Sequence, residues 1–189
     1  MQSFAVWLLP EASVREDLEG WIRELAGRWG SRVFAPHVTV FSGARSLEGG
    51  ASFESIRKRV EALARETRPM TLKVASDRLA YQESFFHAMY VPLEEPEGFE
   101  ARLRNSLSKG VVLKPPPEGT PLHLSLIYQR FGPGVQARIR EELLTGPLGR
   151  LKTITFDALC TLETRDPGAE ISEMASWVVG PPFLLSNAK

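Results

Sequence analysis

The sequence has very little cysteine, no excess charge of either sign and no long apolar run. Cys160 is the single cysteine among 189 residues, so an internal disulfide is impossible and a cysteine-rich zinc module is excluded. Basic and acidic residues number 23 each, which argues against bulk electrostatic capture of long nucleic acid or of an anionic membrane. No segment approaches the ~18 apolar residues of a membrane span, and no basic region precedes the short run from Phe4 to Leu9, unlike a secretory signal. We expect a cytoplasmic protein with no membrane partner.

The composition is that of a globular protein, with 43% hydrophobic and 24% charged residues. A chain of this length corresponds to one domain or to two small lobes, and its core needs no covalent cross-links. Helix and strand patterns run through the middle of the chain, where a flexible linker would otherwise separate two domains. We therefore predict a single bilobal domain over residues 1–189, acting as a monomer.

The pattern of apolar residues repeats in the two halves of the chain. The first half predicts a strand, a helix, a strand, a helix and two strands, at 2–9, 13–29, 36–42, 53–66, 70–74 and 85–92. The second half predicts a helix, a strand, a helix and two strands, at 97–109, 122–128, 134–145, 151–163 and 174–180. The shared order of helix, strand, helix, strand, strand suggests two related lobes.

Two of the three histidines stand in matching tetrapeptides on apolar strands. These are His37-Val38-Thr39-Val40 and His123-Leu124-Ser125-Leu126. At a spacing of two, the imidazole and the hydroxyl project from the same face of a strand. A single copy of so short a motif would be expected by chance, but two copies at equivalent positions of a repeated pattern predict a functional pair.

Two such strands facing each other would surround one cavity with two imidazoles and two hydroxyls. One histidine can take a proton from a nucleophile at neutral pH while the other gives a proton to a leaving group. The hydroxyls of Thr39 and Ser125 can donate hydrogen bonds to oxygens on which charge develops.

The paired motifs resemble those of the two-histidine phosphoesterase superfamily. The opening strand with Trp7, followed by a helix and then by Pro36-His37-Val38-Thr39, is similar to the start of the plant and yeast type cyclic phosphodiesterases. The resemblance implies an α+β fold, a two-lobed pseudo-two-fold duplication with antiparallel sheets facing a central cleft and helices on the outside. It also implies hydrolysis of a small ribose cyclic phosphate, with no cofactor.

Carried over to this sequence, the resemblance makes His37 and His123 the acid–base pair, with His123 as base and His37 as acid. It makes Thr39 and Ser125 the hydrogen-bond donors to phosphate. Trp7 and Tyr128 match aromatic residues that contact the substrate, Trp7 by stacking on a base. Packing within the core is the alternative for both aromatic residues. The likeness further implies a nucleoside 2′-phosphate as product.

The third histidine, His87, lacks a hydroxyl two residues further on, where Met89 stands. We predict that His87 is a buried or edge histidine outside the paired motifs, and that Cys160 is a packing residue.

Metal-dependent and nucleophilic hydrolysis fit the sequence less well. The three histidines are far apart in the sequence and form no short ligand pair of the kind that zinc sites use, so we predict no metal site. A serine hydrolase would need a Gly-x-Ser-x-Gly turn, which the sequence lacks.

Two other functions remain open. One is an RNA-acting enzyme of the same superfamily, either a 2′–5′ RNA ligase or an RNA 2′,3′-cyclic phosphodiesterase, which would take RNA ends as partners. The other is a non-catalytic nucleotide-binding module on the same scaffold. A pure binder has no need of two titratable imidazoles, which favours the enzyme.

Overall fold

The structure is a computed structural model that describes residues 2–45, 52–94, 98–108, 112–113, 121–164, 174 and 177–186. These residues form four α-helices, two short 3-10 helices and antiparallel strands, so the predicted α+β class is confirmed. The helices are α1 (Ala12–Trp29), α2 (Phe53–Glu66), α3 (Phe99–Leu107) and α4 (Pro133–Thr145), with the 3-10 helices η1 (Ser76–Arg78) and η2 (Pro147–Arg150). The strands are β1 (Gln2–Pro10), β2 (Val38–Arg45), β3 (Met70–Val74), β4 (Met89–Glu94), β5 (Val112–Leu113), β6 (His123–Ile127), β7 (Thr153–Thr164), β8 (Trp177–Val179) and β9 (Phe183–Leu184).

The strands pair in the order β5-β2-β1-β7-β3-β4-β6, with β8 and β9 also paired to β7. Every pairing is antiparallel. Strands twist relative to their neighbours, and the strand path curves until β6 at its end contacts β2 near the opposite end. The strands that carry the two motifs are thus brought together although several strands separate them in the pairing order. The predicted two-lobed duplication stays a prediction.

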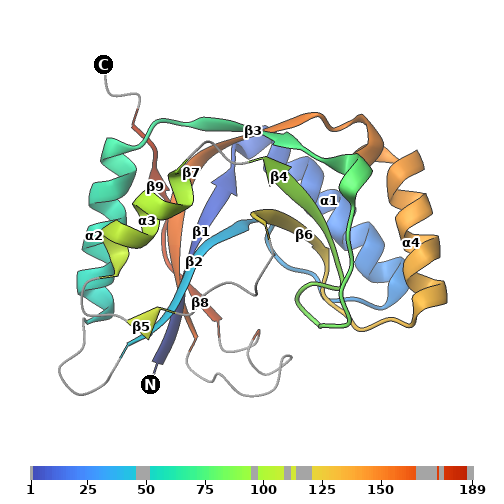
Figure 1. Cartoon of the computed structure of the whole chain (residues 1–189), viewed down its shortest axis with the longest axis horizontal. Helices are drawn as coiled ribbons and strands as arrows, with labels where there is room; N and C mark the ends of the chain where they lie inside the picture. The colour runs from blue at the N-terminus through green and yellow to red at the C-terminus, as the bar shows by residue number, and fades with distance from the viewer. Residues whose placement is uncertain are drawn as a thin grey trace.

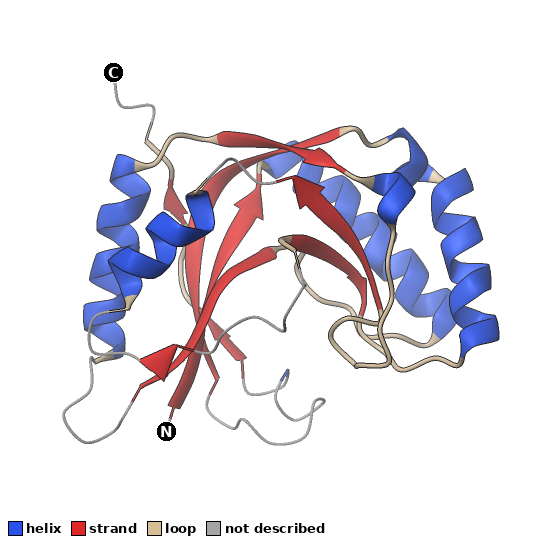
Figure 2. Ribbon diagram, viewed as in Figure 1, coloured by secondary structure: helices blue, strands red, loops and turns tan. Residues whose placement is uncertain are grey.

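The helices lie at two sides of the strands. Figure 1 shows α2 and α3 on one side and α1 and α4 on the other, and Figure 2 shows the strands filling the space between them. Helix α2 contacts β7 and α3 contacts β2, while α1 contacts β6. None of the helices in the described ranges combines the length and apolarity needed to cross a membrane.

Strand β1 separates the main core from a second apolar cluster. Its side chains alternate between two faces, as expected for a strand. Phe4, Val6 and Leu8 belong to the main core, and Ala5, Trp7 and Leu9 belong to the second cluster, which also contains residues of β7. One strand therefore anchors the fold with one face and offers the other face to the candidate site.

Some predicted strands begin later in the structure. The strand predicted at 36–42 begins at Val38, so His37 lies just before β2 and not in it. The pattern at 85–92 predicted a strand from Phe85, but β4 begins at Met89, and residues 85–88 form turns. The Gln82 amide donates to the His87 carbonyl, and the His87 amide donates to the Ser84 hydroxyl. Bonds of this kind from a serine to nearby backbone compete with a strand, so the chain turns before β4 begins.

Candidate active site

Both motif histidines border one cavity of about 240 Å³. The wall includes Trp7 from β1, His37 from just before β2, Thr39 from β2, and His123 and Ser125 from β6. The structure therefore brings together the residues that the sequence singled out from the two halves of the chain. Tyr128, the sixth predicted site residue, follows β6 and lines the same cavity.

The two imidazoles are held in the same way. Nδ1 of His37 lies 2.7 Å from the carbonyl oxygen of Ala35, and Nδ1 of His123 lies 2.9 Å from that of Pro121. A carbonyl can only accept, so Nδ1 carries the proton of each neutral ring and donates it to the main chain. The lone pair of each neutral ring is then on Nε2, where proton transfer requires it; on His37 this nitrogen also faces the Tyr128 hydroxyl.

His37 is the more enclosed of the pair. It is 4% exposed, and its ring stacks on Trp7 with 3.6 Å between centroids and 14° between planes. The Tyr128 hydroxyl lies 3.4 Å from Nε2 of His37. His123 is half-buried and lies beside Tyr90, 4.7 Å between ring centroids. The two halves of the site thus differ in solvent access.

Burial disfavours the protonated, charged form of both motif histidines. Loss of hydration lowers the pKa of His37 to about 4, although the hydrogen bond to the Ala35 carbonyl acts the other way. Burial likewise lowers the pKa of His123 to about 4, opposed by the Pro121 carbonyl. Charge on His123 further lowers the pKa of His37. At neutral pH, both imidazoles in the empty cavity are therefore neutral.

The two motif hydroxyls are placed differently. Thr39 is exposed at the cavity wall, whereas Ser125 is 5% exposed. The Ser125 hydroxyl donates a hydrogen bond of 3.2 Å to the carbonyl of Phe86, in the turn that precedes β4. The two motifs are therefore alike in sequence, but their hydroxyls differ in burial and in hydrogen bonding.

The two predicted aromatic residues are packed as well as bordering the cavity. Trp7 is 3% exposed, and Tyr128 is 4% exposed with its ring stacked on Phe34 at 3.8 Å. Burial raises the pKa of the Tyr128 phenol, and the neighbouring Ser125 hydroxyl acts weakly in the other direction. The phenol stays neutral and can both donate and accept.

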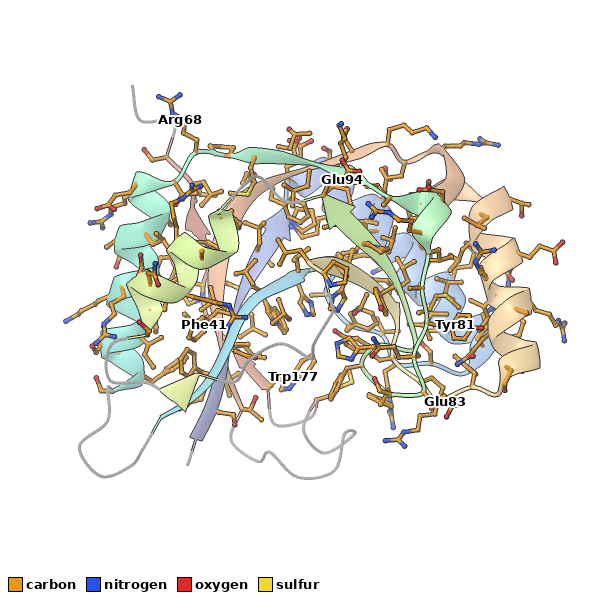
Figure 3. All side chains as sticks on the ribbon, viewed as in Figure 1. Phe41, Arg68, Tyr81, Glu83, Glu94 and Trp177 are labelled. Carbon is orange, nitrogen blue, oxygen red and sulfur yellow. The ribbon has the colours of Figure 1, made fainter. Side chains whose placement is uncertain are left out.

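The cavity wall also includes residues that were not predicted from the sequence. Among them are Phe86, His87, Arg104 and Trp177. Trp177 lies in the lower centre of the view in Figure 3, and its ring stacks on that of Phe86 at 5.9 Å. No motif distinguishes these residues, because each reaches the cavity through folding of a turn, a helix or a chain-terminal strand.

The lining suits a small anion that carries an apolar group. Arg104, half-buried on α3, is the one lining residue with a permanent charge among the described part of the chain, and no carboxylate is among the lining residues described. Aromatic and aliphatic side chains supply most of the remaining wall, as is typical of small-molecule sites. Within the described ranges, no three His, Cys, Asp or Glu side chains gather in a group that could hold a metal ion.

By sequence, no family model and no curated protein matches this chain. Its structure is similar to that of E. coli LigT in the apo form, with 14% identity, a TM-score of 0.51 and coverage of 98% of each chain. It is also similar to E. coli LigT complexed with 3′-AMP, with 15% identity, a TM-score of 0.54 and coverage of 98% of this chain and 99% of that one.

Kluyveromyces marxianus Usb1 also matches, with 16% identity, a TM-score of 0.44 and coverage of 95% and 97% of the two chains. The similarity to LigT extends over nearly the whole chain at 14–15% identity. This chain has a LigT-like α+β fold.

Proposed function

We propose that this chain is a cyclic phosphodiesterase that hydrolyses small ribose cyclic phosphates to phosphomonoesters without a metal ion. The substrate class is a nucleoside 2′,3′-cyclic phosphate or ADP-ribose cyclic phosphate. One observation carries the proposal: His37 and His123 border one cavity, each with Nδ1 bonded to a main-chain carbonyl and Nε2 left for proton transfer. The likeness to LigT complexed with 3′-AMP supports a ribose phosphate as the kind of ligand.

The reaction needs one proton taken and one proton given. Nε2 of His123 accepts a proton from water as the water oxygen forms a bond to phosphorus. The bond from phosphorus to the ribose 3′ oxygen breaks on the opposite side, and Nε2 of protonated His37 gives that oxygen a proton. The product is a 2′-phosphate, and a proton exchange with solvent restores the pair.

The surroundings of His37 support its role as the acid. The Tyr128 hydroxyl lies 3.4 Å from Nε2, and a phenol can donate to the neutral ring or accept from the protonated one. It can therefore hold the imidazole in place through both protonation states. His123 has greater access to solvent, which suits a base that must meet water.

Two groups are proposed to stabilise the negative charge on phosphate. The Thr39 hydroxyl lies at the wall beside the histidines and Arg104 reaches the cavity from α3, whereas the Ser125 hydroxyl donates to the Phe86 carbonyl. Donors fixed where charge develops lower the barrier most, because they need no reorganisation during the reaction. Trp7 and Tyr128 are proposed to bound the part of the cavity that takes the ribose.

A substrate panel tests the proposal. Purified protein is mixed with 2′,3′-cyclic nucleotides, ADP-ribose cyclic phosphate, 3′,5′-cyclic nucleotides and RNA with a cyclic phosphate end, and release of each monoester is measured by chromatography. We expect turnover of the small ribose cyclic phosphates and none of the 3′,5′-cyclic nucleotides. Absence of hydrolysis across the panel, in protein that binds nucleotide, would leave the non-catalytic module in its place.

The histidine variants are the internal controls of that panel. His37→Ala and His123→Ala should each lower turnover by ~10²–10⁴-fold. The double variant should lose far less than the product of the two single losses, because the residues act as a pair. Near-full activity in a folded single variant would refute the acid–base pairing.

The RNA-acting alternative is separated by comparing substrates of different length. A mononucleotide cyclic phosphate and an oligonucleotide with the same cyclic end differ only in the chain outside the reacting group. We expect the mononucleotide to have at least the same kcat/KM. A clear preference for the oligonucleotide, or ligation of 2′–5′ ends, would make the chain an RNA-acting enzyme.

A further inference from the structure

The turn before β4 carries a third histidine into the cavity. The backbone N–H of Gln82 donates a hydrogen bond of 2.9 Å to the carbonyl of His87, which closes the turn. The Ser84 hydroxyl accepts a hydrogen bond of 3.2 Å from the backbone N–H of His87. The same hydroxyl also lies 3.2 Å from Nδ1 of the His87 ring. Both the backbone and the ring of His87 are therefore fixed by Ser84.

The ring of His87 lies beside one of the motif histidines. Its centroid is 5.0 Å from that of His123, with the planes at 63°, and the residue is half-buried at the cavity wall. Burial lowers the pKa of His87 below its ordinary value. With Nδ1 next to Ser84, the nitrogen at the other end of the ring is Nε2.

Ser125 fixes this turn to the second motif strand. Its hydroxyl donates to the carbonyl of Phe86, the residue directly before His87. A serine hydroxyl has one proton, so Ser125 cannot donate to a phosphate oxygen without releasing the turn. The first motif has a different arrangement, because Thr39 is exposed at the cavity wall.

From this geometry we infer that His87 binds the substrate phosphate on the His123 side of the cavity, and that Ser125 acts by positioning the turn that carries His87. The inference rests on the proposed function and names a further residue of the same site. When the Ser84 hydroxyl donates to Nδ1, the proton of the neutral ring lies on Nε2. His87 then offers an N–H donor to a non-bridging oxygen, while Nε2 of His37 and His123 offer lone pairs. The three histidines thereby divide into two that exchange protons and one that donates a hydrogen bond.

Binding of a product analogue tests His87 apart from catalysis. Affinities for a nucleoside 2′-monophosphate and for the matching nucleoside are measured by calorimetry at pH 7 on wild type, His87→Phe, His87→Gln and Tyr81→Phe. His87→Phe keeps a ring and removes the donor, and His87→Gln keeps an N–H near the position of Nε2. Tyr81 is 48% exposed in the same segment and serves as the matched control.

We expect His87→Phe to weaken binding of the monophosphate by about 10- to 100-fold, the usual effect of losing a hydrogen bond to a charged group. Binding of the nucleoside should change little, and His87→Gln should recover most of the affinity. Equal weakening of nucleoside and nucleotide, or an unchanged affinity for the monophosphate in His87→Phe, would overturn the inference.

Ser125 is tested by a double-variant comparison. If Ser125 acts through the turn, Ser125→Ala should weaken monophosphate binding, Ser125→Thr should restore it, and Ser125→Ala combined with His87→Phe should be no worse than His87→Phe alone. If the loss of affinity in the double variant equalled the product of the two single losses, Ser125 would contact the phosphate independently of His87. Because these readouts are binding constants, they stand even if the wild type hydrolyses none of the panel, which would refute the proposed function alone.

Discussion

The indole of Trp7 lies flat on the imidazole of His37, with 3.6 Å between ring centroids and 14° between planes. The Trp7 ring also makes an edge contact with Trp177 at 5.4 Å. One face of Trp7 is thus occupied by the histidine that it helps to bury. A nucleotide base could stack only on the part of the Trp7 ring that His37 and Trp177 do not cover.

Truncation of Trp7 should affect His37 before it affects base binding. In Trp7→Ala we expect a lower kcat and a destabilised protein, by ~3–5 kcal/mol as for other buried aromatic truncations, because the imidazole loses the surface that orients it. The ratio of kcat/KM between a nucleoside cyclic phosphate and a ribose cyclic phosphate without a base should stay nearly constant. A rise in KM confined to base-bearing substrates, with an unchanged melting temperature, would instead support base stacking on Trp7.

The pH dependence of kcat/KM follows from the lowered pKa values of the pair. Both His37 and His123 have a pKa of about 4 in the empty cavity, and the reaction needs one of them protonated. As the pH rises above that value, the singly protonated form becomes scarce. We expect kcat/KM to fall from about pH 5 to about pH 8, approaching one decade per pH unit.

The profile of kcat should be shifted relative to that of kcat/KM. The negative phosphate raises the pKa of a nearby histidine, so kcat should begin to fall at a higher pH. Steady-state rates across the pH range, with a check that the protein stays folded, test both statements. A kcat/KM that rises through neutral pH would contradict the assignment of lowered pKa values.

Acid should destabilise the fold through His37. Its pKa is about 4 when folded, against an ordinary value of 6.5. Between these pH values His37 is protonated in the unfolded chain and neutral in the folded chain. Stability is therefore lost as the pH falls from about 6.5 to about 4, and this contribution does not change above that window. His123 contributes in the same direction.

Removing the imidazole should remove that part of the pH dependence. Urea unfolding of wild type and of His37→Gln at pH 7.5 and pH 5 gives the difference directly. We expect the loss on acidification to be smaller in the variant by about 1–2 kcal/mol. The exposed Glu83→Gln serves as the control, and an equal loss in all three proteins would contradict the prediction.

Substitutions at Thr39 and at its neighbour Val38 should have different effects, one on turnover and the other on stability. Thr39 is exposed at the cavity wall, while Val38 is fully buried in the main core. Thr39→Ala should cost roughly 1–4 kcal/mol of transition-state stabilisation with little change in melting temperature. Val38→Ala should lower stability by on the order of 2 kcal/mol and leave turnover per folded molecule near the wild-type value. The reverse pattern would mean that these positions have exchanged faces.

Activity should survive treatment with EDTA. Imidazoles, hydroxyls and a guanidinium can supply both the proton transfers and the charge stabilisation that the proposed reaction needs. We expect the same turnover before and after dialysis against the chelator, measured on the best substrate of the panel. Loss of activity that zinc or manganese restores would show that a metal ion takes part.

The sequence predicted most of the elements and the convergence of His37 and His123 on one cavity. Helix α2 spans Phe53–Glu66, as the periodicity of its apolar residues predicted. The motif strands were located because alternation and an i, i+2 pair are local patterns. The convergence of the two motifs was predicted from their equivalent positions in the repeated order of elements. No local pattern predicts the curvature of the sheet that brings β6 to β2.

What the sequence did not predict depends on contacts between distant or irregular segments. His87 reaches the cavity because Ser84 and Gln82 bond to it within a turn, where alternation predicted a strand. Strict alternation along 36–42 would put Phe41 on the same strand face as His37 and Thr39, but a register shift in the pairing of β1 with β2, between Val6 and Trp7, interrupts it. Phe41 instead packs on Phe4 in the core, on the α3 side of β2 (Figure 3).

The bonds from His37 and His123 to the carbonyls of Ala35 and Pro121 tie one nitrogen of each imidazole to the main chain. Every amino acid has a carbonyl, so the side chains at positions 35 and 121 can be exchanged for others that keep the backbone path without breaking either bond. These two bonds are therefore insensitive to the side chains of the residues that accept them and sensitive to the course of the backbone. An engineer who wished to move this site to another scaffold would need to reproduce two short stretches of backbone, together with the contacts that Trp7 and Tyr128 make with His37.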